Sequence, residues 1–271
     1  EKLTNWETIV KIPFFKYSDL YKSKEQEFIK VLNDVGNRGA YIMQDDLSTF
    51  ESEISNFCGC KYAVGVGNAT DALEMLIQSS GIGQGDEVIF CSHTMVATAS
   101  AIHINGAKPV PVEAGTDHLI DPDSIKIAIT SKTKAILPTQ LNGRTANMDE
   151  IQKIADEHGL LLIEDSAQAL GSKYKGKHAG TFGLGGCISF YPAKLLGCFG
   201  DGGMILCNDS EIYNKLILLR DHGRDPKTGD VLIWGRNSRL DNLQAALLRY
   251  QFKNFEKTIM ERRQLANLYH E

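Results

Sequence analysis

Three polar side chains with complementary chemistry lie near the middle of the sequence, beside short apolar runs. Asp165 follows the run 160–163, while Ser189 lies inside a second run, 187–191, that is soon followed by Lys194. A short apolar run bounded by polar residues is typical of a buried parallel strand. Open α/β sheets bind ligands at the carboxyl ends of such strands, so these three side chains are candidates for a binding or catalytic site.

A lysine amine, a carboxylate and a hydroxyl are what a protein must supply to hold pyridoxal 5'-phosphate. The amine of Lys194 would form a Schiff base with the aldehyde, and the Asp165 carboxylate would keep the pyridine nitrogen protonated, which makes the ring an electron acceptor. The hydroxyl of Ser189 would hold the phosphate. Residue types alone leave other roles open: an exposed surface lysine, a carboxylate that caps the next turn, and a strand hydroxyl bonded to the backbone.

A further candidate site lies in residues 61–73, where a predicted strand passes through a glycine turn into a helix. The free amides and partial positive charge of a helix N-terminus bind phosphate, and Ala69 and Thr70 would lie there. Gly65 and Gly67 also begin a dinucleotide-binding fingerprint, but Thr70 replaces its third glycine. A plain strand–helix turn without a ligand is the remaining interpretation.

Predicted strands and helices alternate over residues 61–207, which indicates an α/β fold. Residues 1–22 are predicted to form an irregular arm. Residues 36–39 should break the first helix, and Ser48 should cap the second. The other predicted strands span 86–90, 109–112, 133–137 and 204–207. The predicted helices span 25–35, 48–57, 94–105, 121–129, 148–158, 210–220 and 241–270.

Two longer segments carry a family resemblance. Residues 163–180 read IEDSAQALGSKYKGKHAG, and residues 189–205 read SFYPAKLLGCFGDGGMI. Together they closely resemble the DegT/DnrJ/EryC1/StrS sugar aminotransferase family, whose members are fold-type-I pyridoxal phosphate enzymes. The resemblance runs from about residue 12 to the end of the chain and includes DHGR at 221–224 and GRNSRLD at 235–241.

The resemblance implies a three-layer α/β/α large domain with a mixed, mostly parallel seven-stranded sheet, as in relatives of aspartate aminotransferase. Residues 1–22 would be an N-terminal arm and residues 23–245 the cofactor-binding large domain. Residues 246–271 would begin the helix that leads to a small C-terminal domain. We expect most of that small domain to be missing, because the chain ends inside a helical pattern and begins at Glu1.

The resemblance also implies roles for single residues. Lys194 would be the Schiff-base lysine and proton carrier, and Asp165 the partner of the pyridine nitrogen. Gln168 would lie near the phenolic oxygen of the cofactor, although it could be an ordinary polar helix residue. Asn237 would reach across a dimer interface to the phosphate of the neighbouring subunit, which implies a homodimer. The implied phosphate ligands are Ala69, Thr70 and Ser189.

The sequence departs from the family pattern at several positions, among them Cys91, where the family often has proline. The family usually has an aromatic residue at the position of Met95, where it stacks on the cofactor ring, and often has tyrosine at His93. Either side chain could cover the ring here, and ordinary packing is the alternative for both. The family commonly has histidine at Gln140 and an aromatic residue at Asn142, in a loop that faces the substrate in relatives. This difference could indicate a changed acceptor or neutral drift.

The activity that the resemblance implies is amino transfer in two half-reactions with ping-pong kinetics. The donor would be an amino acid, most often glutamate, and the acceptor a keto sugar, usually linked to a nucleotide. A cyclitol or other non-nucleotide acceptor, or a pyridoxal phosphate sensor without turnover, are the alternatives. Relatives that carry out dehydration have histidine in place of the lysine, so Lys194 favours amino transfer. A nicotinamide dehydrogenase built on Gly65 and Gly67 would leave Lys194 without a role.

Composition sets outer limits on function. The chain has 271 residues, 42% of them hydrophobic, which is enough for a large core. A net charge of −5 gives no basic surface for nucleic acid or anionic membranes. No signal-peptide pattern or membrane-length apolar run is visible, so we expect a cytoplasmic protein. The six cysteines and seven histidines are scattered, and Cys58-Gly59-Cys60 lacks a second pair, so no metal site is predicted.

Overall fold

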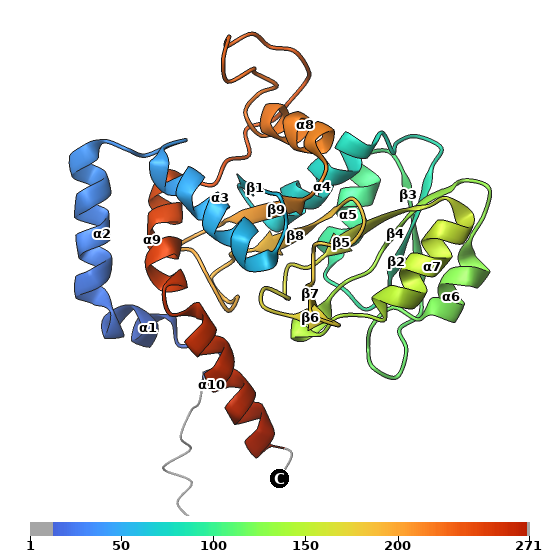
Figure 1. Ribbon diagram of the computed structural model, residues 1–271, viewed down its shortest axis with the longest axis horizontal. Helices are drawn as coiled ribbons and strands as arrows, with labels where there is room; N and C mark the ends of the chain where they lie inside the picture. Colours follow the sequence, from blue (N-terminus) through green and yellow to red (C-terminus); the bar gives the residue numbers. More distant parts are fainter. Residues whose placement is uncertain (1–12, 270–271) are drawn as a thin grey trace, which may run out of the picture.

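A seven-stranded mixed sheet forms the centre of the computed structural model, which describes residues 13–269 (Figure 1). The strand order is β1-β9-β8-β5-β4-β2-β3, and β9 is the strand that runs antiparallel to both of its neighbours. The predicted mixed, mostly parallel sheet is therefore confirmed. The strands are β1 (Tyr62–Val66), β2 (Glu87–Cys91), β3 (Lys108–Val112), β4 (Thr133–Leu137), β5 (Leu161–Asp165), β8 (Gly185–Ser189) and β9 (Gly203–Cys207), with a separate hairpin of β6 (Lys173–Tyr174) and β7 (Lys177–His178).

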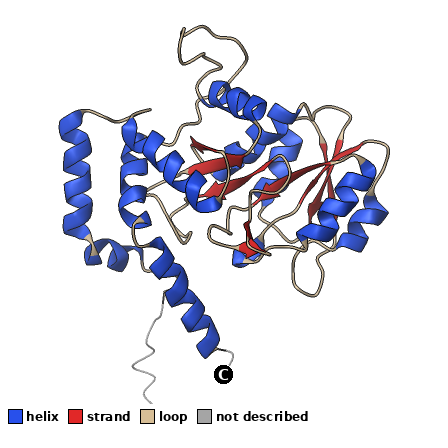
Figure 2. Cartoon of the chain, in the orientation of Figure 1, coloured by secondary structure: helices blue, strands red, loops and turns tan. Residues whose placement is uncertain are grey.

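Helices cover both faces of the sheet, which confirms the predicted three layers (Figure 2). Successive side chains of a strand point to opposite faces. In β4, Ala135 and Leu137 pack with α4, α5 and α8, whereas Ile136 packs with α6 and α7. Helices α3 and α9 cover the second face over β1, β8 and β9. The helices are α1 (Tyr17–Ser23), α2 (Glu25–Arg38), α3 (Asp45–Cys58), α4 (Ala69–Ser80), α5 (Val96–Ile104), α6 (Pro122–Ala128), α7 (Met148–His158), α8 (Ser210–Arg220), α9 (Asn242–Phe252) and α10 (Phe255–Leu268).

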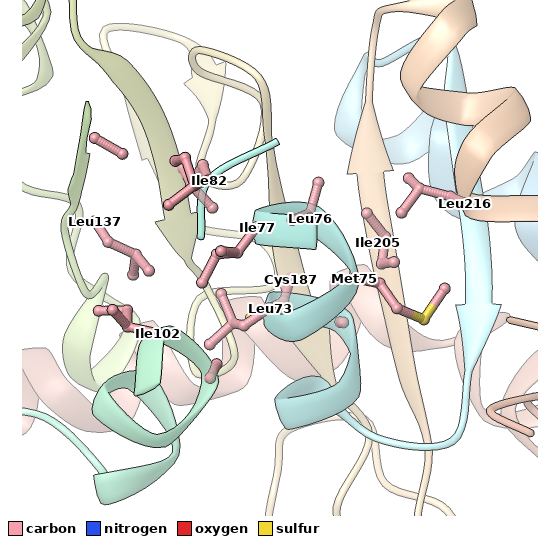
Figure 3. Close-up of a cluster of buried hydrophobic side chains, with 14 of the residues drawn as sticks. Leu73, Met75, Leu76, Ile77, Ile82, Ile102, Leu137, Cys187, Ile205 and Leu216 are labelled. Atoms are coloured by element: carbon pink, nitrogen blue, oxygen red, sulfur yellow. The ribbon is translucent and has the colours of Figure 1, made fainter. Parts of the chain in front are cut away.

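Helix α4 is the central helix of the first face. Its side chains Leu73, Met75, Leu76 and Ile77 are almost completely buried. Figure 3 shows them gathered with side chains of α5, α8 and the sheet. Burying four such side chains stabilises the fold by roughly 1.5–3 kcal/mol each, so the position of the α4 N-terminus is firmly fixed against the sheet.

The strand directions bring six carboxyl ends to one edge of the sheet. Strands β8, β5, β4, β2 and β3 are mutually parallel, and β1 runs the same way because β9 is antiparallel to both β1 and β8. The loops that follow these strands therefore meet at that edge. We call it the carboxyl edge. No helix of the described residues 13–269 is long and apolar enough to cross a membrane.

Several predicted boundaries were wrong. Helix α2 continues through residues 36–38 and ends at Gly39, whose φ of 62° terminates it. Helix α3 begins at Asp45 instead of 48, and Ser48 donates to the Asp45 carbonyl within the helix instead of capping it. Its Leu47 amide donates to Asn242 Oδ1, at 2.9 Å, so the cap comes from α9.

Two further differences lie at the ends of the chain. The predicted single helix 241–270 is two helices, α9 and α10, separated at Lys253 and Asn254. The predicted irregular arm 1–22 contains part of helix α1, while residues 1–12 lie outside the described part. The division into a large domain and the start of a small C-terminal domain stays a prediction.

A glycine on β9 fixes how closely the sheet approaches α4. A Cβ atom on Gly203 would lie 2.4 Å from the Asn68 carbonyl carbon and 2.8 Å from the Ala69 nitrogen. We expect Gly203→Ala to lower the free energy of unfolding by about 2 kcal/mol, because backbone atoms cannot move aside as a flexible side chain does. Urea unfolding followed by circular dichroism measures this.

The control for this substitution is Gly36→Ala in α2. A Cβ atom there would have no neighbour within 4 Å. Because alanine favours a helix over glycine, this variant should be unchanged or more stable by about 0.5–1 kcal/mol. Equal stability of the two variants would contradict the close packing of Gly203.

Candidate active site

Asp165 is the last residue of β5, and its carboxylate is buried at the carboxyl edge with 5% exposure. Its Oδ2 accepts a hydrogen bond from Thr98 Oγ1 at 2.6 Å, and its Oδ1 accepts one from the Ala167 amide at 3.2 Å. The thiol of Cys187 lies 3.5 Å from Oδ1. The Ala167 contact means that Asp165 caps the following turn, and its role towards a ligand stays a prediction.

Lys194 lies in the loop after β8 and is half-buried. Burial lowers the pKa of its amine, while the negative charge of Asp165 opposes that shift. Within residues 13–269 the amine has no ion-pair partner, although Asp165 is close enough to influence it. This environment differs from that of an exposed surface lysine, and a lysine with a lowered pKa is more often neutral and nucleophilic.

Ser189 lies beside the N-terminus of α4. Strand pairing places Ser189 opposite Gly203, and Gly203 packs directly against the backbone of Asn68 and Ala69. The Ser189 hydroxyl accepts a hydrogen bond from the Tyr191 amide at 3.2 Å. Its own proton has no acceptor among the described residues. A free hydroxyl therefore lies close to the free amides of a helix N-terminus.

The first turn of α4 is ordered by its own cap. Asn68 Oδ1 accepts from the Asp71 amide at 2.8 Å, and the Asn68 carbonyl accepts from the Ala72 amide at 3.2 Å. The amides of Ala69 and Thr70 have no acceptor in the part of the chain that the structure describes. These two amides point out of the helix, as the predicted anion site requires.

Met95 and His93 both follow β2, and both are exposed at the carboxyl edge. Met95 is 61% exposed, and its sulfur accepts from the Ala97 amide at the start of α5. His93 Nδ1 lies 3.1 Å from the His118 carbonyl, which turns its ring towards the loop after β3. Of the two, Met95 lies nearer in sequence to Thr98, the residue that bonds Asp165.

Gln168 lies in the turn after β5 and not in a helix. Its Oε1 accepts from the Asn142 amide at 3.1 Å, so it connects the loops that follow β5 and β4. Asn142 has a φ of 54°, a left-handed conformation that asparagine tolerates better than most residues. Gln168 is thereby held close to Asp165.

Asn237 is exposed, and its side chain has no hydrogen-bond partner among residues 13–269. Its neighbour Ser238 is buried and accepts from the Gly67 amide at 3.0 Å, next to the N-terminus of α4. The segment 235–241 therefore lies beside the N-terminus of α4. A second subunit would be needed for Asn237 to act across an interface, and that role stays a prediction.

Gly65 and Gly67 have structural roles that do not involve a dinucleotide. The Gly65 amide donates to Glu51 Oε1 at 2.8 Å, and a Cβ atom at Gly65 would lie 2.6 Å from Leu47 Cδ1 in α3. The Gly67 amide is occupied by Ser238. These glycines allow α3 and the segment 235–241 to approach β1, which removes the basis for the dehydrogenase alternative.

Sequence reasoning missed the role of Gln140. Its side chain is fully buried, with Nε2 donating to Glu164 Oε2 at 2.7 Å and Oε1 accepting from the Ala146 amide at 2.8 Å. Glu164 also accepts from the amides of Gly180 and Phe182. The expectation that position 140 faces the substrate is therefore wrong for this side chain, which instead anchors the β5–β8 connection.

A hollow of about 320 Å³ opens at the carboxyl edge beside these residues. Loops that follow β2, β3 and β4 line it, and Arg144 Nη1 donates to the Asp117 carbonyl at 2.9 Å across its wall. Asn142 connects it to Gln168. The lining residues are His93, Asp117, His118, Leu119, Leu141, Asn142 and Arg144.

Comparison with known proteins identifies the family. The sequence model of the DegT/DnrJ/EryC1/StrS aminotransferase family matches residues 22–271. The chain belongs to this family. The resemblance found in the sequence is thus confirmed, and members of the family are the appropriate reference for the geometry of the carboxyl edge.

The chain is similar to several family members over most of its length. It is 41% identical over 259 residues to a pleiotropic regulatory protein of Geobacillus stearothermophilus, covering 95% of this chain and 69% of the relative. It is 40% identical over 260 residues to the dTDP-3-amino-3,4,6-trideoxy-alpha-D-glucose transaminase of Streptomyces venezuelae, covering 96% and 68%.

A solved structure agrees with the fold. The crystal structure of S. venezuelae DesV in complex with a ketimine intermediate superimposes with a TM-score of 0.87 at 40% identity, covering 91% of this chain and 66% of that chain. The chain thus spans about two thirds of the length of these family members.

The buried Glu164 gives a test of pH-dependent stability. Burial raises the pKa of Glu164 to about 7, against the three hydrogen bonds that it accepts. A carboxyl group whose pKa is higher in the folded state stabilises most below its unfolded value of about 4.5, and this contribution is lost as the pH rises through about 7. The free energy of unfolding should therefore decrease by about 3 kcal/mol between pH 4.5 and 7.

Glu164→Gln removes that titration. Its absolute stability should be lower, because one amide proton would face a backbone donor, but stability should fall less between pH 5 and 7 than in the wild type. Urea unfolding at several pH values measures how the free energy of unfolding of the wild type and of the variant changes with pH. Glu157→Gln on the exposed face of α7 is the control. Identical slopes for wild type and Glu164→Gln would contradict the raised pKa.

Proposed function

We propose that the protein is a pyridoxal phosphate-dependent aminotransferase that transfers an amino group from an amino acid to a nucleotide-linked keto sugar. Family membership supports this class of reaction, and the transaminase of S. venezuelae supports the class of acceptor. The observation that carries the proposal is the unpaired, half-buried amine of Lys194 within electrostatic reach of the buried Asp165. Glutamate is the first donor to test.

The residues at the carboxyl edge fit the proposed cofactor. The phosphate would bind to the amides of Ala69 and Thr70 and to the Ser189 hydroxyl. These three hydrogen-bond donors have no acceptor among the described residues. The pyridine nitrogen would face Asp165, and Gln168 would lie near the phenolic oxygen. Met95, with its polarizable sulfur, would cover the ring, because His93 turns towards the loop after β3.

When bound, pyridoxal phosphate supplies an aldehyde carbon and a ring that accepts electrons. Lys194 Nζ would serve as base and acid: it would take the proton from the α-carbon of the donor and deliver it to the former aldehyde carbon of the cofactor. Because burial lowers its pKa, this amine is neutral at a lower pH than an ordinary lysine. The Asp165 carboxylate would hold a proton on the pyridine nitrogen through a charge-assisted hydrogen bond.

The two substrates use the same site in turn, so the kinetics are ping-pong. The proposal includes a homodimer, since the exposed amide of Asn237 is free to contact the phosphate bound by a neighbouring subunit. The acceptor would occupy the hollow beside Gln168. The polar groups of Asp117, Asn142 and Arg144 in its wall are suited to the hydroxyl groups of a sugar.

The central test follows the absorbance spectrum of the purified protein with pyridoxal phosphate, before and after addition of glutamate. Borohydride reduction and peptide mapping should place the cofactor on Lys194, and glutamate should convert the spectrum to that of pyridoxamine phosphate. Lys194→Arg should abolish the adduct, because guanidinium does not form a Schiff base, whereas the exposed Lys177→Arg should retain it.

Two outcomes would contradict the proposal in different ways. An adduct on Lys194 that no amino acid discharges would indicate a pyridoxal phosphate sensor without turnover. An adduct on another lysine would remove the assignment of Lys194 altogether.

The acceptor hollow predicts a separate effect of Arg144. In Arg144→Ala, the KM for the best substrate among dTDP-, UDP- and GDP-linked keto sugars should rise about tenfold, as expected for a lost charged hydrogen bond. The glutamate half-reaction, measured by absorbance, should keep its rate. Lys153→Ala on the exposed surface of α7 is the control. A slowed glutamate half-reaction with unchanged acceptor KM would contradict this location.

A further inference from the structure

Three threonine hydroxyls form a continuous hydrogen-bonded row that ends on the Asp165 carboxylate. Thr139 Oγ1 lies 2.9 Å from Thr94 Oγ1, which lies 2.8 Å from Thr98 Oγ1, which in turn lies 2.6 Å from Asp165 Oδ2. Thr98 is completely buried and Thr139 is 4% exposed. The row joins the loops that follow β2 and β4 to helix α5 and to the last residue of β5.

The chemistry of the groups fixes the direction of every proton in this row. An ionised carboxylate can only accept, so the single proton of Thr98 points to Asp165. Thr98 must then accept from Thr94, which uses the only proton of Thr94. Thr94 must accept from Thr139 for the same reason. All three O–H dipoles therefore point towards the carboxylate, and aligned hydrogen bonds of this kind strengthen one another.

Three groups contact the Asp165 carboxylate. Thr98 donates to Oδ2 from α5, whereas the Ala167 amide and the Cys187 thiol contact Oδ1. The backbone of Asp165 is also fixed, since its amide donates to the Pro138 carbonyl and its carbonyl accepts from the Gln140 amide. The side-chain torsion that ends in a carboxylate is otherwise broad, and Thr98 supplies the contact on Oδ2 that, with those on Oδ1, fixes the plane of the two oxygens.

We propose that Thr98, Thr94 and Thr139 are positioning residues that hold the Asp165 carboxylate in the plane required by the protonated pyridine nitrogen of the cofactor. This inference rests on the proposed function. The row acts through Asp165 and does not touch the cofactor, so its effect is confined to the interaction at the ring nitrogen. Phosphate binding by Ala69, Thr70 and Ser189 is independent of it.

The test compares the affinities of two cofactors for the purified apoprotein by equilibrium fluorescence titration. One is pyridoxal 5'-phosphate, and the other is its 1-deaza analogue, in which carbon replaces the ring nitrogen. We expect Thr98→Val, which keeps the shape of the side chain without its hydroxyl, to weaken pyridoxal phosphate binding about tenfold and to leave the analogue unchanged. Thr98→Ser keeps the hydroxyl and should restore the preference for pyridoxal phosphate.

Thr139→Val at the far end of the row should reduce the preference for pyridoxal phosphate over the analogue by about threefold. It removes only the cooperative strengthening of the Thr98–Asp165 hydrogen bond. This variant keeps the test available if Thr98→Val does not fold, which circular dichroism establishes. Equal loss of affinity for both cofactors would show a purely structural role and overturn the inference. Loss of the preference with an intact Lys194 adduct would support it, whereas a wild type without any Lys194 adduct would instead refute the proposed function.

Discussion

Two adjacent buried carboxylates at the end of β5 must both be satisfied, and the arrangement of the carboxyl edge follows from this. Alternation along the strand sends Asp165 towards α5 and Glu164 towards the opposite face. Glu164 accepts from two backbone amides and Gln140, and so fixes the connection to β8. Asp165 accepts from Thr98, from the Ala167 amide and from the Cys187 thiol, and its negative charge opposes the lowering of the Lys194 pKa by burial. Both carboxylates are therefore satisfied, Glu164 by the loop that leads to β8 and Asp165 by α5, the following turn and β8 itself.

Much of the fold could be predicted because the signals are local. Strand β4 and helix α7 have the predicted limits, since their apolar periodicity is clear and Gly159 ends the helix with a φ of 62°. The start of α3 could not be found in this way. One of its first amides, that of Leu47, donates to Asn242, which lies far along the chain in α9. A cap supplied by tertiary packing leaves no pattern in the neighbouring residues.

The same distinction separates the predictable and unpredictable parts of the site. Lys194, Asp165 and Ser189 could be singled out because each has distinct chemistry and lies at a strand end. The threonine row and the burial of Gln140 could not, because they depend on loops from different strands meeting in space. The departures from the family pattern at His93, Met95 and Asn142 lie at the open rim, whereas the groups beneath them are buried. The departure at Gln140, in contrast, is fully buried, so the differences from the family pattern are not confined to the rim.

The late position of β9 in the sequence has a consequence for the order in which the protein assembles. During synthesis β1 emerges early, yet its partner in the sheet is β9, with Tyr62 opposite Cys207. Such a distant pairing is slow to form and leaves the edge of β8 open until the later segment arrives. The hydroxyl of Ser189 and the α4 N-terminus come together only when Gly203 lies between them. A phosphate-bearing ligand that needs both would therefore bind the completed sheet and not its precursors, and would stabilise the completed sheet relative to them.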